Sequence, residues 1–233
     1  MLQTIVHRVV IAAGTTDCEA RADGFLLQPV NALSSLAFAV VGIVIMGWAR
    51  VVTGSERTNR IIFGVILVAT GVGSFLYHGY DGAVVHLVHD ITFLAALMFI
   101  VVMNGCALLA RPVRTGYIWT TFLTLLVSIV LVVTPATTNV FTAGLVVAIV
   151  VSDVMIRRHG GIDAPRWWIA VVAMSAAVAA FVMGRTAGPL CDPGSVVQGH
   201  ALWHMLSAVA LGSYFAATTP VRIHGRRTDE PTS

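Results

Sequence analysis

The residues of this chain that are best suited to chemistry are histidines, an aspartate and a serine that lie in or beside apolar segments. His200 and His204 are four residues apart, so on a helix both rings lie on one face about one turn apart. Two imidazoles in this arrangement can share one metal ion, as the paired helical histidines of metalloproteases do. Taken alone, the pair is also compatible with hydrogen bonding between helices, which is the commoner role of a single histidine inside a membrane.

The types of these residues predict a hydrolytic zinc site. A catalytic zinc ion usually has three protein ligands and a water molecule, with a carboxylate nearby that takes the proton of that water. The three ligands here are His78, His200 and His204. Asp90 is the candidate base that would hold and deprotonate the water. Ser74, four residues before His78, would donate a hydrogen bond to a developing oxyanion.

Other ionisable residues near this set have weaker signals. His86 and His89 lie within one turn of Asp90, and they are predicted either to support the ligand set or to be solvated at the membrane interface. Asp153 and Arg157 are four residues apart, which predicts an ion pair on one helix.

Membrane-spanning helices must position these residues, because the composition excludes an ordinary soluble domain. Of 233 residues, 57% are hydrophobic and 11% are charged, against about 25% charged residues in a typical soluble domain. Spanning a bilayer takes about 20 mostly apolar residues, and no segment alternates as the strands of a membrane barrel do. The predicted fold is an all-α bundle of seven transmembrane helices in one domain, with a cytoplasmic tail at 218–233. The helices are predicted at 31–49, 61–78, 83–103, 117–133, 139–156, 167–183 and 200–217.

The arginines predict how the bundle is oriented. The chain has 14 basic residues, all arginine, and eleven of them fall in the first, third and fifth loops and the C-terminal tail. The other side of the membrane has only Arg8, Arg21 and Arg185. By the positive-inside rule, the N-terminus is outside and the C-terminus is cytoplasmic. The basic pI of about 9.1 is thereby explained without a nucleic-acid partner. The use of arginine without lysine indicates a GC-rich genome, which points to a bacterium. The predicted location is therefore the bacterial plasma membrane, as a multi-pass protein.

With this orientation, the chemistry-bearing residues converge at one depth near the outer membrane face. The second helix ends there with Ser74 and His78. The third helix begins there with His86, His89 and Asp90, and the seventh begins there with the pair His200 and His204. Ionisable groups inside a membrane are costly and are usually functional. The convergence therefore favours a metal site over separate interhelical hydrogen bonds.

The same residues resemble the motif of the alkaline ceramidase family, whose superfamily includes adiponectin-receptor-like and haemolysin III-like seven-helix proteins. The shared pattern is Ser74-x3-His78, then Asp90, then His200-x3-His204, and it covers residues 16–215 in the same order. The resemblance implies a zinc-dependent enzyme that cleaves the amide of ceramide within the membrane and releases a fatty acid and a sphingoid base. Similar local strings are Gly71-Val72-Gly73-Ser74, Gln198-Gly199-His200-Ala201-Leu202-Trp203-His204, Cys18-Glu19 and Asn31-Ala32-Leu33-Ser34-Ser35-Leu36.

The chain departs from the family pattern between His78 and Asp90. The gap is about one residue longer than in the animal enzymes, and a loop that contains Gly79 and Gly82 would accommodate the extra residue.

The second departure is at the calcium site that the family has near its N-terminus. Asp17 and Glu19 remain as parts of a degraded site, but Arg21 and Gln28 stand where the family pattern has Asn and Glu. An arginine opposes a cation in a site of oxygen ligands, so the sequence does not predict bound calcium.

The three cysteines are separated by the predicted topology. Cys18 and Cys191 both fall on the outer side, where an oxidising compartment permits disulfides. The resemblance implies a bridge between these two. Cys106 lies near the cytoplasmic end of the third predicted helix and is expected to remain a thiol.

The leading prediction is an integral-membrane zinc hydrolase whose substrate is a membrane lipid, ceramide or another N-acyl lipid. Its long acyl chains would fit an apolar pocket between helices. The alternative is a receptor-like or structural seven-helix protein with a non-catalytic zinc site. Asp90 favours the enzyme, because a structural zinc site is usually closed by a fourth protein ligand. A proton-coupled transporter would need ionisable residues near the middle of the membrane, and the fourth and sixth predicted helices have almost none.

Overall fold

The computed structural model describes residues 17–80, 82–158 and 162–224, with side chains as far as Thr218. Within these residues the protein is helical and has no strand, which confirms the predicted all-α class. Seven long helices follow the order of the seven predicted segments. The elements are α2 (Pro29–Trp48), η1 (Ala49–Val51), α3 (Gly54–Tyr80), α4 (Ala83–Leu108), α5 (Val113–Val133), η2 (Pro135–Thr137), α6 (Thr138–Arg158), α7 (Ala164–Met183) and α8 (Gly199–His224).

Six of these helices, α2 to α7, are long and apolar enough to cross a membrane, counted over the residues that the structure describes. The exterior of the bundle has the matching character. Along α5, Phe122, Leu125, Ile129 and Val132 are all exposed, and their spacing of three and four residues places them on one helical face. A continuous apolar outer face of this kind fits contact with lipid rather than water. The chain therefore has the features of a multi-pass membrane protein.

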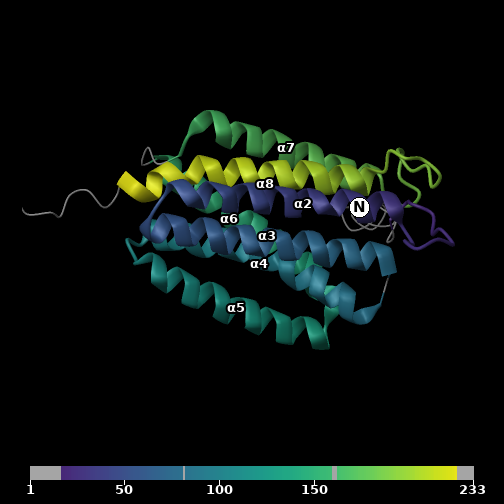
Figure 1. Ribbon diagram of the computed structural model, residues 1–233, viewed down its shortest axis with the longest axis horizontal. Coiled ribbons are helices and arrows are strands. Elements are labelled where there is room, and N and C mark those ends of the chain that lie inside the picture. The colour runs from purple at the N-terminus through teal and green to yellow at the C-terminus, as the bar shows by residue number, and fades with distance from the viewer. Residues whose placement is uncertain (1–16, 81, 159–161, 225–233) are drawn as a thin grey trace, which may run out of the picture.

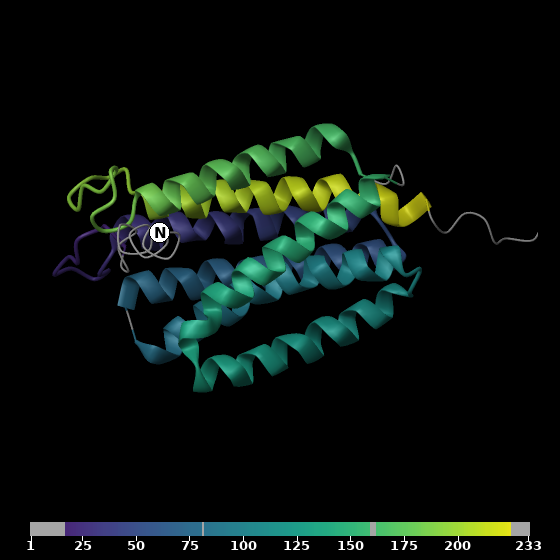
Figure 2. The same ribbon diagram turned by 180° about the vertical axis from the view of Figure 1, so that it is seen from behind.

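The helices are packed side by side in a bundle (Figure 1). α8 lies between α7 and α2, α3 packs against α2, and α4 packs against α3. α5 and α6 both pack against α4, and α6 runs obliquely across the others (Figure 2). α4 therefore contacts three other helices, α3, α5 and α6, and many of its side chains between Leu94 and Cys106 are buried.

Small residues allow the closest helix contacts. A Cβ added at Gly42 of α2 would lie 2.5 Å from the carbonyl oxygen of Gly64 in α3. A Cβ at Gly199, the first residue of α8, would lie 2.6 Å from the Cα of Gly184, which follows α7. Close backbone approach at small residues is a common way to pack membrane helices, because dispersion contacts replace the hydrophobic effect there. The Gly184–Gly199 contact also sets where His200 enters the bundle.

The observed helices extend past the predicted apolar segments, mainly at polar ends. α3 begins at Gly54 rather than at 61, and its first turns contain Glu56 and Arg60 with a 2.7 Å ion pair between Oε1 and Nε. α8 continues to His224, into the range 218–233 that was predicted as a tail, and residues 225–233 lie outside the described part. Polar residues can continue a helix beyond the hydrocarbon core because the backbone bonds do not depend on hydropathy.

A buried polar cluster ties four helices together at the end of the bundle opposite His78. Asp153 of α6 accepts hydrogen bonds from Asn104 of α4 at 3.1 Å, from Trp167 of α7 at 3.0 Å and from the hydroxyl of Tyr214 in α8. The guanidinium of Arg157 lies over the ring of Trp167, 3.9 Å from its centroid. The predicted Asp153–Arg157 ion pair is not among the ion pairs of the described residues, because donors from neighbouring helices surround the carboxylate.

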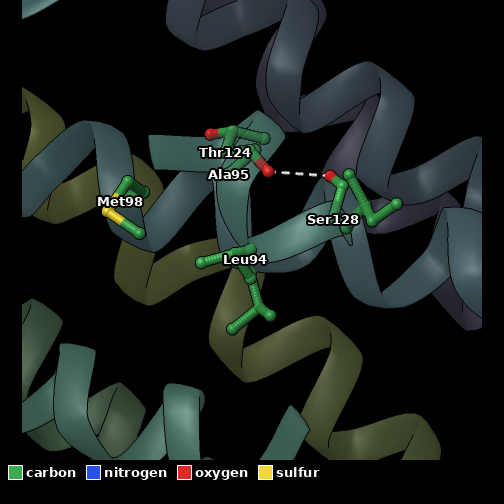
Figure 3. A pocket seen from close by; sticks show the side chains of 7 residues that line it. Leu94, Ala95, Met98, Thr124 and Ser128 are labelled. Carbon is green, nitrogen blue, oxygen red and sulfur yellow. Dashed lines mark hydrogen bonds between the residues drawn. The ribbon is translucent and has the colours of Figure 1, made fainter. Parts of the chain in front are cut away.

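Between α4 and α5 the packing leaves a narrow gap (Figure 3). It is lined mainly by Leu94, Ala95 and Met98 of α4 with Thr124 and Ser128 of α5. The Ser128 hydroxyl donates to the Thr124 carbonyl oxygen at 2.7 Å, so its own helix satisfies it. The gap has essentially no volume open to water, and we assign it to packing rather than to function.

Candidate metal centre

Three histidines from two helices meet inside one end of the bundle. His78 lies in the last turn of α3, and His200 and His204 lie in the first two turns of α8. All three are buried, and one ligand nitrogen from each lies within 4.8 Å of the other two. Within the described residues this is the one group of three or more His, Cys, Asp or Glu side chains arranged to hold a metal ion. The tertiary structure thus brings together the three ligands predicted from sequence.

The ring nitrogens of this group fit a metal ion. The Nδ1 atom of His78 lies 2.9 Å from Gln28 Oε1, and the Nδ1 atom of His204 lies 3.0 Å from Ser34 Oγ. The Nε2 atoms of His78 and His200 are buried and have no hydrogen-bond partner. A buried polar atom without a partner costs about 1–3 kcal/mol, so such atoms are rare unless a ligand completes them. Ligating histidines usually have one nitrogen held by the protein and the other on the metal.

Asp17 lies against the same group. Its Oδ1 atom accepts a hydrogen bond from Arg185 Nη1 at 2.8 Å and lies 3.1 Å from His200 Nδ1. The contact with His200 is short enough for a hydrogen bond, but its atoms are not aligned for one, and His200 Nδ1 has no hydrogen-bond partner. The other carboxylate oxygen lies 3.8 Å from His78 Nδ1. Asp17 therefore adjoins two of the three histidines.

Glu19, the second acidic residue assigned to the degraded calcium site, has a different position. Its two carboxylate oxygens accept the backbone N–H groups of Val30 and Asn31, each at 2.8 Å. These groups belong to the first turn of α2, where a helix has N–H groups without partners inside the helix. Glu19 thus caps α2, and Asp17 and Glu19 both have protein donors on their carboxylates.

A cavity of about 550 Å³ opens beside the histidines, a size suited to small-molecule binding. Its polar lining includes Ser74, Asp90, His200 and His204, and His78 is not among the lining residues. Its apolar lining includes Phe38, Phe93, Phe181 and Trp203. Four of the five residues predicted to perform the chemistry therefore share one cavity with large apolar side chains.

Both non-histidine candidates are held in place by hydrogen bonds. The Ser74 hydroxyl lies 2.8 Å from Ser35 Oγ and 3.3 Å from His204 Nε2. Asp90 accepts a hydrogen bond from His89 Nδ1 at 2.9 Å and another from Thr138 Oγ1 at 2.6 Å. The carboxylate is thus fixed between α4 and the start of α6.

His86 and His89 lie beside Asp90. The Nε2 atom of His86 is 3.7 Å from Asp90 Oδ2, and its ring stacks on that of Tyr77 with centroids 4.7 Å apart. His89 contacts the ring of His78 only edge-on, with centroids 6.2 Å apart. These contacts favour the same role for His86 and His89, which is to hold the carboxylate of Asp90 in position.

Several side chains around this site carried no signal of their own in the sequence. Thr138 follows a proline-containing turn and is indistinguishable from a turn residue, and Arg185 was counted only as a loop charge. The serines of α2 did belong to a string that resembles alkaline ceramidases, but nothing in their spacing indicated contact with a histidine about 170 residues away. The residues in question are Ser34, Ser35, Thr138 and Arg185. Gln28 was singled out only as a departure from the calcium-site pattern, and not as a partner of His78.

The predicted bridge between Cys18 and Cys191 is present as a disulfide, with Cα atoms 5.5 Å apart. It joins the segment before α2 to the segment before α8, 173 residues apart in sequence. Cys106 is buried in α4 and does not take part in it.

The disulfide leads to a direct labelling prediction. In denaturant without reductant, Cys18 and Cys191 are expected to resist alkylation, and after reduction both should react completely. Cys106 serves as the internal control, because reduction should leave its labelling unchanged. Mass spectrometry of the digested protein would read all three sites, and alkylation of Cys18 and Cys191 without reductant would contradict the bridge.

Comparison of the chain with protein-family models and with curated proteins finds no match in either set. The geometry of the site therefore carries the functional assignment.

Proposed function

We propose that this protein is a zinc-dependent membrane hydrolase that cleaves the amide bond of a lipid such as ceramide. The observation that carries the proposal is the group of three buried histidines, two with unpartnered Nε2 atoms, beside a cavity that Asp90 also lines. Imidazole nitrogens suit zinc, and three protein ligands are the usual number in a catalytic site. Among the described residues no carboxylate or thiolate completes a group of four, which favours catalysis over a closed structural site.

The predicted site residues on the cavity each have a role in amide hydrolysis. A zinc ion held by the three histidines would supply Lewis-acid chemistry. Asp90 would take the proton of the attacking water and pass it to the leaving nitrogen, while His89 and Thr138 hold its carboxylate in position. Ser74 would donate a hydrogen bond to the carbonyl oxygen as negative charge develops there. The products would be a fatty acid and, from ceramide, a sphingoid base.

The apolar part of the cavity supports a lipid as the substrate. Phe38, Phe93, Phe181 and Trp203 line it together with the polar groups, so an acyl chain and a polar head could be bound at once. At about 550 Å³ the cavity would hold only part of a long-chain lipid. The resemblance of the motif residues to the alkaline ceramidases supports the same substrate class.

We further propose that the site lies near the outer face of a bacterial plasma membrane. Along α3, Arg57 and Arg60 stand in the first two turns and His78 in the last. Eighteen residues of helix separate Arg60 from His78, which is about 27 Å at 1.5 Å per residue. The arginine-rich end would face the cytoplasm by the positive-inside rule, and the histidines would then lie toward the opposite face.

Metal removal tests the proposal directly. Protein purified in detergent is expected to hold about one zinc ion per chain and to hydrolyse at least one member of a panel of N-acyl lipids that includes ceramide. Chelation should abolish the hydrolysis, and added zinc should restore it, with magnesium as the matched control. Zinc binding without turnover of any N-acyl lipid would instead assign the ion to a structural or receptor-like role.

A further inference from the structure

The segment that precedes α2, residues 17–28 and here called the N-terminal strap, is bound to the segment that precedes α8. Asp17 and Arg185 form an isolated antiparallel backbone bridge, and the Thr186 hydroxyl donates to the Asp17 carbonyl oxygen at 3.1 Å. The Cys18–Cys191 disulfide lies next to these contacts. Figure 1 shows the two segments, purple and yellow-green, together at one end of the bundle. The disulfide therefore lies at one end of the strap, beside Asp17.

The other end of the strap is bound to α3 beside His78. The backbone N–H groups of Leu27 and Gln28 donate to the carbonyl oxygens of Gly79 and His78, at 2.9 and 3.0 Å. The Gln28 side chain donates from Nε2 to the Glu19 carbonyl oxygen at 3.1 Å, and its Oε1 lies 2.9 Å from His78 Nδ1. The first contact fixes the direction of the amide, because a carbonyl oxygen can only accept. Oε1 is thus the atom turned toward His78.

The hydrogen bond to Gln28 fixes the tautomer of His78, and the position of Asp17 favours one tautomer of His200. An amide oxygen and a carboxylate both act only as acceptors, so Gln28 requires a proton on Nδ1 of His78, and Asp17 favours one on Nδ1 of His200. A neutral imidazole with its proton on Nδ1 has its lone pair on Nε2, and these are the two buried Nε2 atoms that lack partners. Arg185 donates to the same Asp17 oxygen, Oδ1, at 2.8 Å, so the half-buried carboxylate has a cationic partner.

We propose that the N-terminal strap is part of the metal centre: Asp17 and Gln28 are positioning residues that hold His200 and His78 in the coordinating tautomer, and the Cys18–Cys191 disulfide keeps the strap in place. The inference rests on the metal site of the proposed function. It makes the zinc affinity depend on a disulfide that does not itself touch the ion.

The test is the zinc dissociation constant of the purified chain, measured by competition with a chromogenic chelator. Asp17→Ala and Gln28→Ala should each weaken zinc binding by about 10- to 100-fold, the usual effect of removing a partner of a ligating histidine. Asp17→Asn keeps one acceptor oxygen and should weaken it less than Asp17→Ala does. Asp23→Ala is the matched control, since Asp23 lies in the same strap but is exposed, and it should bind zinc as the unmodified chain does.

The disulfide is tested by a thermodynamic cycle. The double change Cys18→Ser and Cys191→Ser should weaken zinc binding, and Asp17→Ala in that background should add little, because the strap is already released. Cys106→Ser is the control for loss of a thiol. Normal zinc affinity in both Asp17→Ala and Gln28→Ala, with helical content intact by circular dichroism, would overturn the role of the strap. A chain that binds no zinc even when unmodified would instead overturn the proposed function.

Discussion

Asp90→Asn is expected to lower the rate of lipid-amide hydrolysis by about 10²- to 10⁴-fold, the range for removal of a general acid–base group, while zinc stays bound. Asparagine keeps the size of the side chain. Its amide oxygen can still accept the hydrogen bond that His89 donates to Oδ1 of Asp90, and its NH2 group, in the place of Oδ2, can donate to the hydroxyl oxygen of Thr138. It cannot take a proton from water at neutral pH. The expected loss is therefore chemical rather than structural, and it would appear in the turnover number measured with saturating lipid.

Asp153→Asn is the matched control for this change. Asp153 is also a buried helical carboxylate with several donors, but it lies in the polar cluster at the other end of the bundle. Its loss should lower the melting temperature and leave the rate per folded molecule nearly unchanged. If Asp90 is only a structural partner of His86 and His89, then Asp90→Asn should behave in the same way. Near-normal turnover in Asp90→Asn with zinc bound would rule out the proposed mechanism.

His204→Ala should reduce the zinc content from about one ion per chain to almost none. His204 is nearly fully buried, Ser34 lies at its Nδ1 and Ser74 at its Nε2, and its ring contacts those of His78 and His200. Its removal leaves two protein ligands where a catalytic zinc site has three. The effect should exceed the loss of about 10- to 100-fold expected from removing an outer hydrogen-bond partner. Elemental analysis of the purified, dialysed protein measures it.

His86→Ala is the control for loss of an imidazole at the same end of the bundle. The His86 side chain is about half exposed and contacts Asp90 and Tyr77 rather than the three-histidine group, so its removal should leave the zinc content unchanged. His78→Ala and His200→Ala should behave like His204→Ala. Full zinc occupancy in all three ligand variants would disprove the site.

The sequence by itself was sufficient to predict the helices and the local pairs of the site. Apolar segments of nearly 20 residues predict spanning helices because the backbone satisfies its own hydrogen bonds in a helix and no other open structure does so in lipid. The four-residue spacing of His200 and His204 placed them on one face because the helical repeat is a local property. Residue types then indicated a metal site, since few side chains besides histidine offer a neutral nitrogen ligand.

Only the tertiary structure decided which side chains face one another across helices. Asp153 shows the difference most clearly: the sequence predicted a local pair with Arg157, but packing surrounds the carboxylate with donors from α4, α7 and α8. Likewise Thr138 reaches Asp90 because α6 packs against α4. Such contacts depend on crossing angles and on close approaches such as Gly184 to Gly199, and neither can be derived from the periodicity of one segment.

The contacts of the N-terminal strap could not be predicted from local patterns either, because their partners are far away in the sequence. The resemblance to alkaline ceramidases implied that Cys18 pairs with Cys191, and the structure contains that bond. No spacing rule indicated that Asp17, the residue before Cys18, would lie beside His200 and Arg185. A local pattern fixes the face of a helix on which a side chain lies. It does not fix the partner that the side chain meets there. The partners of Asp17 come from chain segments more than 160 residues away, and the positions of those segments follow only from the packing of the whole bundle.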